Sequence, residues 1–198
     1  MKNQIVIATS NVKKLVEIQS ILNDMSVEIL PQSFFKIDAA EEPFHTFVEN
    51  ALIKARHASR LSKLPAIADD SGISVDILGG QPGVLSARFA GEPSSDQKNN
   101  EKLLKLLENE TNRKAHYTCV IVFVKHELDP EPVIAEGIWH GEILKSPRGS
   151  GGFGYDPLFL DHITEKSVAE LTSEIKNRIS HRGQALNKLK LKLNQIYE

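Results

Sequence analysis

The sequence has few of the features that mark a specialised class of protein. Its 198 residues include one cysteine, Cys119, which excludes an intramolecular disulfide and cannot alone form a cysteine-rich zinc site. The longest uninterrupted apolar run, Cys119–Val124, is far shorter than the roughly 20 residues that cross a bilayer, and it favours a buried strand cysteine over a catalytic thiol. Met1 leads into a short strand pattern without the long apolar core of a signal peptide, so we expect a cytoplasmic protein.

A large excess of charge of either sign is also missing. Lys and Arg number 24, Asp and Glu number 26, and the net charge is −2. This balance argues against a protein that coats nucleic acid or membranes, because such partners require a large basic excess. It leaves room for a local basic pocket that binds one small anion. The length predicts a single domain over residues 1–198, with two lobes of one fold as the alternative.

Strand and helix patterns alternate along the chain, which predicts an α/β fold. The predicted strands are Ile5–Ala8, Val27–Leu30, Pro65–Ala68, Tyr117–Lys125, Pro132–Trp139 and Leu158–Leu160. The predicted helices begin after Asn11, at about Phe44, at Ser94 or Ser95, at about Ser173 and at about Gln184. Thr46 and Glu49 have the spacing of a capping box near the start of the second helix. Glycine-rich loops are expected at residues 79–83 and 146–152.

The first candidate for chemistry is the corner where the Ile5–Ala8 strand meets the next helix. Backbone N–H groups at the helix start, together with Thr9, Ser10 and Asn11, can cradle phosphate oxygens. Lys13 or Lys14 can add a positive charge. The glycines of a Walker P-loop are absent, and an ordinary helix cap beside two solvated lysines is the alternative.

The second candidate is acidic. Glu41 and Glu42 precede a predicted helix, and Asp69 and Asp70 stand at the predicted end of a buried strand. Carboxylates at strand ends suit magnesium, which prefers oxygen ligands and retains waters. The alternatives are a solvated loop for the glutamates and an Asx-turn into Gly72 for the aspartates.

Gly149–Gly154 formally matches the dinucleotide fingerprint G-x-G-x-x-G. Such a loop should open a helix, whereas Tyr155–Leu160 is predicted to be extended, so we reject a dinucleotide-binding fold. A better interpretation is a flexible loop that presents the flat ring of Phe153 for stacking, with Asp156 as a hydrogen-bond acceptor.

Lys176, His181 and Arg182 form a basic cluster near a predicted helix end. Arg182 carries a planar set of donors that can bind a carbonyl or phosphate oxygen, although a cluster that only complements the helix dipole is the alternative. The chain contains no H-E-x-x-H and no G-x-S-x-G motif. Together the four candidates make up the inventory of a nucleotide site.

Six segments of the chain resemble the motifs of the inosine triphosphate pyrophosphatase family, also called Ham1-like. The resemblance runs from Ile5 to about Leu189, with the motifs in the expected order. The segments are Thr9–Lys14, Phe47–Arg56, Ala68–Gly72, Gly79–Arg88, Gly152–Pro157 and Ser180–Gly183.

The resemblance implies a mixed central sheet flanked by helices, with two lobes and the nucleotide site in the cleft. It also implies magnesium-dependent hydrolysis of ITP, dITP and XTP to the monophosphate and pyrophosphate, and a homodimer. Asp70 would be the catalytic base and, with Glu42, a metal ligand. The substrate-binding residues implied are Thr9, Ser10, Asn11, Val12, Lys13, Lys14, Lys54, Ser71, Phe153, Gly154, Tyr155, Asp156, Lys176, His181 and Arg182.

The chain departs from the family pattern in two places. Ser10 replaces a glycine and Lys13 replaces a small residue, and Glu41–Thr46 differs from E-E-T-G-x-T, so the choice between Glu41 and Glu42 stays open. Two other functions are compatible with the same residues. One is a Maf-like pyrophosphatase that acts on other nucleotides, and the other is a nucleotide sensor without catalysis.

Overall fold

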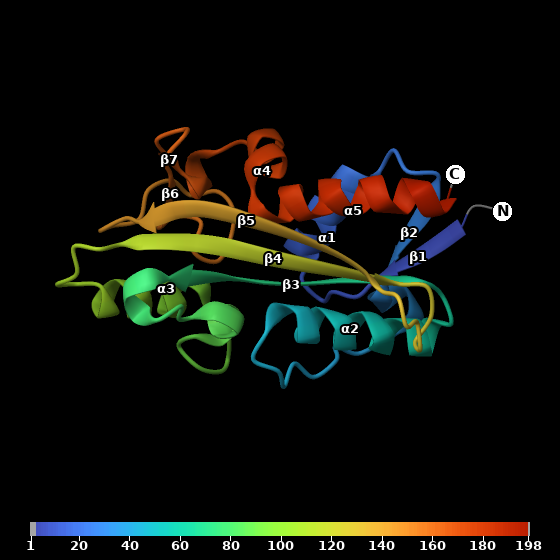
Figure 1. The fold of residues 1–198 in the computed structure, drawn as a ribbon. Coiled ribbons are helices and arrows are strands. Elements are labelled where there is room, and N and C mark those ends of the chain that lie inside the picture. Colours follow the sequence, from blue (N-terminus) through green and yellow to red (C-terminus); the bar gives the residue numbers. More distant parts are fainter. Residues whose placement is uncertain (1–2, 198) are drawn as a thin grey trace. The chain divides into compact units, whose positions relative to one another are not determined.

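A computed structural model describes residues 3–197 of the chain (Figure 1). The strands are β1 (Asn3–Ile7), β2 (Val27–Pro31), β3 (Ala66–Val75), β4 (Lys114–Val124), β5 (Val133–Ile143), β6 (Phe159–Asp161) and β7 (Lys166–Ser167). The α-helices are α1 (Val12–Leu22), α2 (Phe47–Ser62), α3 (Asp96–Leu106), α4 (Ser173–Ile179) and α5 (His181–Tyr197). The short 3-10 helices are η1 (Gln32–Phe35), η2 (Asp76–Leu78), η3 (Gly83–Arg88) and η4 (Val168–Glu170).

All seven strands belong to one mixed sheet, in the order β2-β1-β3-β4-β5-β6-β7. β1 is parallel to β2 and to β3, whereas β6 is antiparallel to β5 and to β7. The sheet and its flanking helices confirm the predicted α/β fold class.

The contacts divide the chain into two compact units, each assembled from separate segments. Unit 1 comprises Met1–Asp70, Cys119–Gly137 and Arg182–Glu198, and unit 2 comprises Ser71–Thr118 and Ile138–His181. The unit boundaries therefore fall inside β3, β4 and β5, and between the first two residues of α5. Asp70 and Ser71 are consecutive residues assigned to different units.

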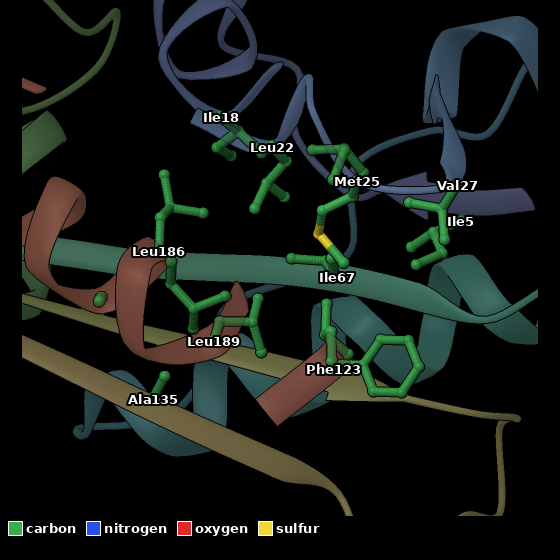
Figure 2. Packing of buried hydrophobic residues seen from close by; sticks show 14 of the residues in the cluster. Ile5, Ile18, Leu22, Met25, Val27, Ile67, Phe123, Ala135, Leu186 and Leu189 are labelled. Atoms are coloured by element: carbon green, nitrogen blue, oxygen red, sulfur yellow. The ribbon is translucent and has the colours of Figure 1, made fainter. Parts of the chain in front are cut away.

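Unit 1 has a separate apolar core on each face of its part of the sheet. Alternate residues of a strand point to opposite faces, and in β4 Cys119, Ile121 and Phe123 pack with α1 and α5, as Figure 2 shows in part. Val120, Val122 and Val124 pack instead with Ala51, Ala55 and Ala58 of α2. In Figure 1, accordingly, α1 and α5 lie above these strands and α2 lies below them.

Unit 2 has its own core, which contains more large aromatic side chains. Tyr117, Trp139, Tyr155 and Phe159 are buried there with aliphatic residues from β3, α3 and η4. The rings of Tyr117 and Trp139 lie 4.8 Å and 5.4 Å from that of Phe159, both in tilted arrangements typical of aromatic pairs.

Several predicted local signals are confirmed. Asn11, Thr46 and Ser95 are the N-caps of α1, α2 and α3, and each accepts hydrogen bonds from backbone N–H groups of the first turn. Such caps supply partners for N–H groups that have none within the helix, and they fix where each helix starts.

The predicted end of the Pro65–Ala68 strand is wrong. β3 continues through Asp69, Asp70 and Gly72 to Val75, so the two aspartates lie within the strand and form no Asx-turn. Gly72 is required there because a Cβ at this position would overlap the carbonyl oxygen of Gly83. The glycine serves close packing against η3, where the sequence suggested a turn.

Two other expectations differ from the structure, and one strand was not predicted. Residues 154–158 form turns, whereas an extended segment was expected, although no helix opens there and the dinucleotide interpretation stays rejected. The last helix begins at His181, three residues before the predicted start, so His181 and Arg182 lie in its first turn. The short strand β7 carries no sequence signal of its own.

Within residues 3–197, no helix is both long enough and apolar enough to cross a membrane.

Candidate functional site

The candidate residues fall into two sets, one in each unit. The set in unit 1 consists of Thr9, Ser10, Asn11, Val12, Lys13, Lys14, Glu42, Lys54, Asp70 and Arg182. The set in unit 2 consists of Ser71, Phe153, Gly154, Tyr155, Asp156, Lys176 and His181. A common cleft for the two sets stays a prediction.

The start of α1 has the geometry of a helix cap. The Asn11 side-chain oxygen accepts from the N–H groups of Lys13 and Lys14 at 3.0 Å and 3.1 Å, and the Thr9 hydroxyl accepts from the Asn11 N–H. Ser10 and Val12 are exposed beside this cap. The start of α1 is therefore capped by Asn11, and the positive end of its helix dipole, which favours a nearby anion, lies beside exposed residues.

Asp69 is buried on the face of the sheet that carries α1 and α5. One of its carboxylate oxygens contacts the ammonium of Lys14 at 3.0 Å and two nitrogens of Arg182 at 3.2 Å and 3.0 Å. Another Arg182 nitrogen donates to Glu17 at 2.7 Å. Burial alone would raise the pKa of Asp69, but Lys14 and Arg182 outweigh it and hold the pKa far below its usual range.

Arg182 is thereby directed at two carboxylates of unit 1. Its side chain is 2% exposed, and three of its N–H groups donate to Asp69 and Glu17. This arrangement fixes α5 to β3 and α1. A role for Arg182 at a bound base stays a prediction.

Asp70 points to the opposite face, toward α2. Its carboxylate accepts from the ammonium of Lys54 at 3.2 Å and from the amide of Asn50 at 3.3 Å. The same ammonium donates to Glu42 at 2.7 Å, so one cation joins the two carboxylates. Burial raises the pKa of Asp70, and the nearby positive charges do not fully offset this effect.

Lys54 remains a cation in this cluster. Burial alone would lower the pKa of Lys54, but Asp70, Asp69 and Glu42 outweigh burial and raise it. Asn50 adds a brace that the sequence analysis missed: its amide also bonds both backbone groups of Phe44 and so holds the loop that carries Glu42. The sequence did offer a signal for Asn50, because it lies four residues before Lys54 and therefore on the same face of the helix.

Glu41 and Glu42 are also consecutive residues whose side chains have different surroundings. Glu42 reaches Lys54, whereas Glu41 lines a different cavity of about 470 Å³ with Arg56, His57 and other residues. The structure therefore favours Glu42 over Glu41 as the partner of Asp70, although the assignment of a metal ligand stays a prediction.

Cys119 has no catalytic character. It is buried, its sulfur lies 4.0 Å from Asp69, and burial raises the pKa of the thiol to about 12. A thiol with that pKa is protonated at neutral pH. The interpretation as a buried strand residue is confirmed.

In unit 2, Phe153, Asp156 and Lys176 form one connected group. Asp156 accepts from the Phe153 N–H at 2.9 Å and from the ammonium of Lys176 at 2.8 Å. That ammonium also lies 4.5 Å from the centre of the Phe153 ring. Asp156, three residues from Phe153, and Lys176, which comes from α4, thus fix one partly buried aromatic ring.

His181 lies against an aromatic wall that the sequence analysis missed. The ring of Tyr117 is stacked on it at 4.5 Å with an interplanar angle of 8°, and Trp139 is stacked at 6.4 Å. Trp139 in turn donates to Asp161 at 2.8 Å. No local motif marks these residues, because only the pairing of strands brings Tyr117 and Trp139 to the same histidine.

The side chain of Tyr155 is directed into the core of unit 2. Its hydroxyl donates to the carbonyl of Ser86 at 2.9 Å, and burial together with the charge of Asp96 raises its pKa. Tyr155 therefore anchors its loop through the side chain, while Ser71, at the start of the β3 segment of unit 2, is half-buried.

Comparison with known proteins gives a consistent picture. Residues 5–192 match the model of the Ham1 family. A dITP/XTP pyrophosphatase from Chromobacterium violaceum is 54% identical over 99% of this chain and 100% of its own length. The dITP/XTP pyrophosphatase of Escherichia coli strain K12 is 50% identical over 94% of this chain and 95% of its own length.

Solved structures show the same fold. A HAM1 protein from Coxiella burnetii superposes with a TM-score of 0.92 at 45% identity, over 98% of this chain and 99% of that chain. The Ham1 protein of Staphylococcus aureus superposes with a TM-score of 0.87 at 38% identity, over 98% and 100% of the two chains.

Proposed function

This chain belongs to the Ham1 family, and from that premise we propose that it hydrolyses non-standard purine nucleoside triphosphates. The substrates would be ITP, dITP and XTP, and the products the nucleoside monophosphate and pyrophosphate. Such an enzyme cleanses the nucleotide pool. The relatives named dITP/XTP pyrophosphatase support this assignment over nearly the full chain. The observation that carries it is the cluster in which the ammonium of Lys54 joins the buried Asp70 to the partly buried Glu42.

The residues present fit a magnesium ion that is shared with the substrate. Two carboxylates, Glu42 and Asp70, converge on one ammonium, and hard oxygen donors of this kind suit magnesium. Within residues 3–197 no group of three acidic, histidine or cysteine side chains can hold a metal. Magnesium is commonly bound through one or two carboxylates, with phosphate oxygens and waters as its other ligands. When bound, the ion would supply positive charge to the phosphate oxygens.

We assign to Asp70 the role of general base. A water that attacks the α-phosphorus loses a proton, and the Asp70 carboxylate can accept it. Burial raises the pKa of Asp70, which makes it a stronger base than an exposed aspartate, while Lys54 keeps it anchored. A positioned base of this kind contributes about 10²–10⁴-fold to the rate.

The start of α1 and the lysines would bind the triphosphate. Thr9, Ser10 and Val12 lie at the positive end of the helix, and Lys13 and Lys14 add charge beside it. Asp69 holds the ammonium of Lys14 in place at 3.0 Å. Positive groups fixed before the reaction stabilise charge on the phosphates without reorganisation.

Unit 2 would bind the base and sugar. Phe153 presents a ring for stacking, and Asp156 and Lys176 hold hydrogen-bonding groups beside it. A donor at this place satisfies the 6-oxo group of a hypoxanthine or xanthine base and is left unpaired by the 6-amino group of adenine. Such a mismatch costs about 1–3 kcal/mol per buried group.

One assay tests the proposal. Pyrophosphate release is measured with magnesium for ITP, dITP, XTP, ATP, GTP and the pyrimidine triphosphates. We expect release from the first three at the highest kcat/KM. Preference for a pyrimidine triphosphate would indicate Maf-like chemistry, and binding without turnover of any nucleotide would indicate a sensor.

Replacing Phe153 tests the stacking role. Phe153→Ala should raise the KM for ITP about tenfold, because one base stack is worth about 1–3 kcal/mol. Phe34→Ala is a matched control, since Phe34 is an exposed phenylalanine of η1 outside both candidate sets. An unchanged KM in Phe153→Ala would remove Phe153 from the site.

We further propose that the enzyme is a cytoplasmic homodimer that acts on free nucleotides and binds neither nucleic acid nor membranes. The balanced net charge of −2 supports a small-molecule substrate, because only the local groups around one nucleotide need to be basic. Sedimentation of the purified protein, with and without duplex DNA, tests both the dimer and the absence of nucleic-acid binding.

A further inference from the structure

Two side chains of α3 bind both backbone groups of a single glycine. The carboxylate of Asp96 accepts from the Gly154 N–H at 2.8 Å, and the amide of Asn100 donates to the Gly154 carbonyl at 3.0 Å. Asp96 and Asn100 are four residues apart, a spacing that places them on the same face of the helix. We call this pair of contacts the Gly154 clamp.

Gly154 has a backbone conformation that needs such support. Its φ angle is +62°, in the left-handed region that side-chain-bearing residues rarely adopt. A Cβ at this position would meet nothing within 4 Å, so the requirement for glycine is conformational and not one of space. The clamp acts on a flexible residue that could otherwise take several conformations.

The clamped groups lie in the two peptide bonds that flank Gly154. The N–H belongs to the peptide bond with Phe153, so Asp96 fixes the backbone directly after the residue whose ring is proposed to stack on the base. The N–H of Phe153 is bound to Asp156, and the Tyr155 hydroxyl is bound to Ser86. The segment is thus held at each of its residues, and α3 supplies the contacts to Gly154.

Asp96 is an unusual residue for this role because it is exposed to solvent. An exposed aspartate normally orients freely in water, yet here it makes a short, charge-assisted bond to a backbone donor. Its charge also contributes to the raised pKa of Tyr155, the residue after Gly154. Asn99 also belongs to α3, and its amide donates to the carbonyls of Ser86 and Ala87. These bonds hold α3 against η3.

We propose that Asp96 and Asn100 are positioning residues that fix the Phe153 ring for stacking on the purine base. This inference rests on the proposed function and extends it to two residues outside the proposed set of substrate-binding residues. Fixing the ring before binding lowers the entropy that the complex must lose, so the clamp acts on affinity for the nucleotide. The chemistry at Asp70 is left unchanged.

The kinetic test uses four variants and ITP with magnesium. Asp96→Ala removes the acceptor and should raise KM about tenfold, the loss of one hydrogen bond to a charged group, with kcat within about twofold of wild type. Asp96→Asn keeps an acceptor oxygen and should restore most of the affinity. Asn100→Ala should raise KM less, because it removes a neutral bond.

The fourth variant separates positioning from the stability of α3. Ser95→Ala removes the N-cap bond that the Lys98 N–H donates to the Ser95 hydroxyl, and it leaves the contacts to Gly154 in place. It should lower the melting temperature and leave KM unchanged. A rise in KM in Ser95→Ala equal to that in Asp96→Ala would overturn the proposal, as would an unchanged KM in Asp96→Ala.

A second measurement does not depend on activity. Hydrogen exchange of the Gly154 amide, followed by NMR, should be slow in the wild type and Asp96→Asn and at least tenfold faster in Asp96→Ala. Rapid exchange in the wild type would show that the clamp does not form. If the clamp forms but no purine triphosphate is hydrolysed, the proposed function fails while the clamp geometry stands; if ITP is hydrolysed and the KM of Asp96→Ala is normal, only the positioning role fails.

Discussion

The pKa values of two consecutive aspartates on opposite faces of β3 are shifted in opposite directions. Asp69 lies on the face covered by α1 and α5, where Lys14 and Arg182 bind a single carboxylate oxygen. Asp70 lies on the face covered by α2, where Lys54 is shared with Glu42. On the first face the cations keep the pKa of the aspartate low, and on the second burial raises it.

This contrast indicates a structural role for Asp69 and a chemical role for Asp70, although the two residues are consecutive. A carboxylate held by an arginine and a lysine is a poor base and a strong structural anchor. A buried carboxylate that shares one lysine with a second acid is a better base and can share a cation with a ligand. The alternation of side chains along a strand is what gives each aspartate its own set of partners.

The largest expected effect is on turnover. Asp70→Asn should keep the fold and lower kcat by about 10²–10⁴-fold, because the amide cannot accept the proton from water. Pyrophosphate release from ITP measures the loss, and circular dichroism confirms the fold. Near-normal turnover in this variant would refute the assignment of Asp70 as base.

The second effect is on stability and belongs to the other face. Asp69→Asn leaves the buried Arg182 and the partly buried Lys14 without their shared carboxylate, which should cost about 3–5 kcal/mol of unfolding free energy. Urea denaturation measures this value. Asp70→Asn is the matched control, and we expect its destabilisation to be clearly smaller; equal losses would erase the difference between the two faces.

The third effect is on the magnesium requirement and tests which glutamate belongs to the cluster on the α2 face. Glu42→Gln should raise the magnesium concentration for half-maximal activity about tenfold, because it removes one of two carboxylates. Glu41→Gln should leave that concentration unchanged, since Glu41 lines a separate cavity. The opposite result would assign the metal to Glu41.

The smallest effect is a pH dependence of stability. The pKa of Asp69 is held low in the folded protein, so its contribution is present above about pH 4 and is lost as pH falls further. Between pH 5 and pH 3 this aspartate should cost the wild type about 1 kcal/mol, a loss that Asp69→Asn does not show. Asp70, whose pKa is raised, should act in the opposite direction over the same range. Urea titrations of both variants at the two pH values test the signs, and equal pH dependence in wild type and Asp69→Asn would contradict the account.

Much of the fold could be predicted from the sequence because its signals are local. Asn11, Thr46 and Ser95 mark helix starts by chemistry that acts within one turn. The apolar runs of β1 and β4 mark strands that are buried on both faces. The prediction of where β3 ends was wrong because it also relied on local signals. Aspartate and glycine disfavour strands locally, but contacts with residues distant in the sequence outweigh that preference.

The candidate site was predictable residue by residue but not in its arrangement. Local motifs and the family resemblance identified Asp70, Lys54 and Glu42. They could not show that Asp69 and Asp70 divide between two faces, because that required the strand to continue past Ala68. Tyr117 and Trp139, which hold His181, have no sequence signal, since strand pairing alone brings them together.

The most direct test of this account is an NMR titration of the two carboxyl groups. Carbon-13 chemical shifts of Asp69 and Asp70, assigned with the two asparagine variants, give both pKa values in one experiment. The account predicts that Asp70 titrates above the value of an unperturbed aspartate, about 3.9, and Asp69 well below it. Titration of both groups together near that value, or in the reverse order, would contradict the division between the two faces of β3.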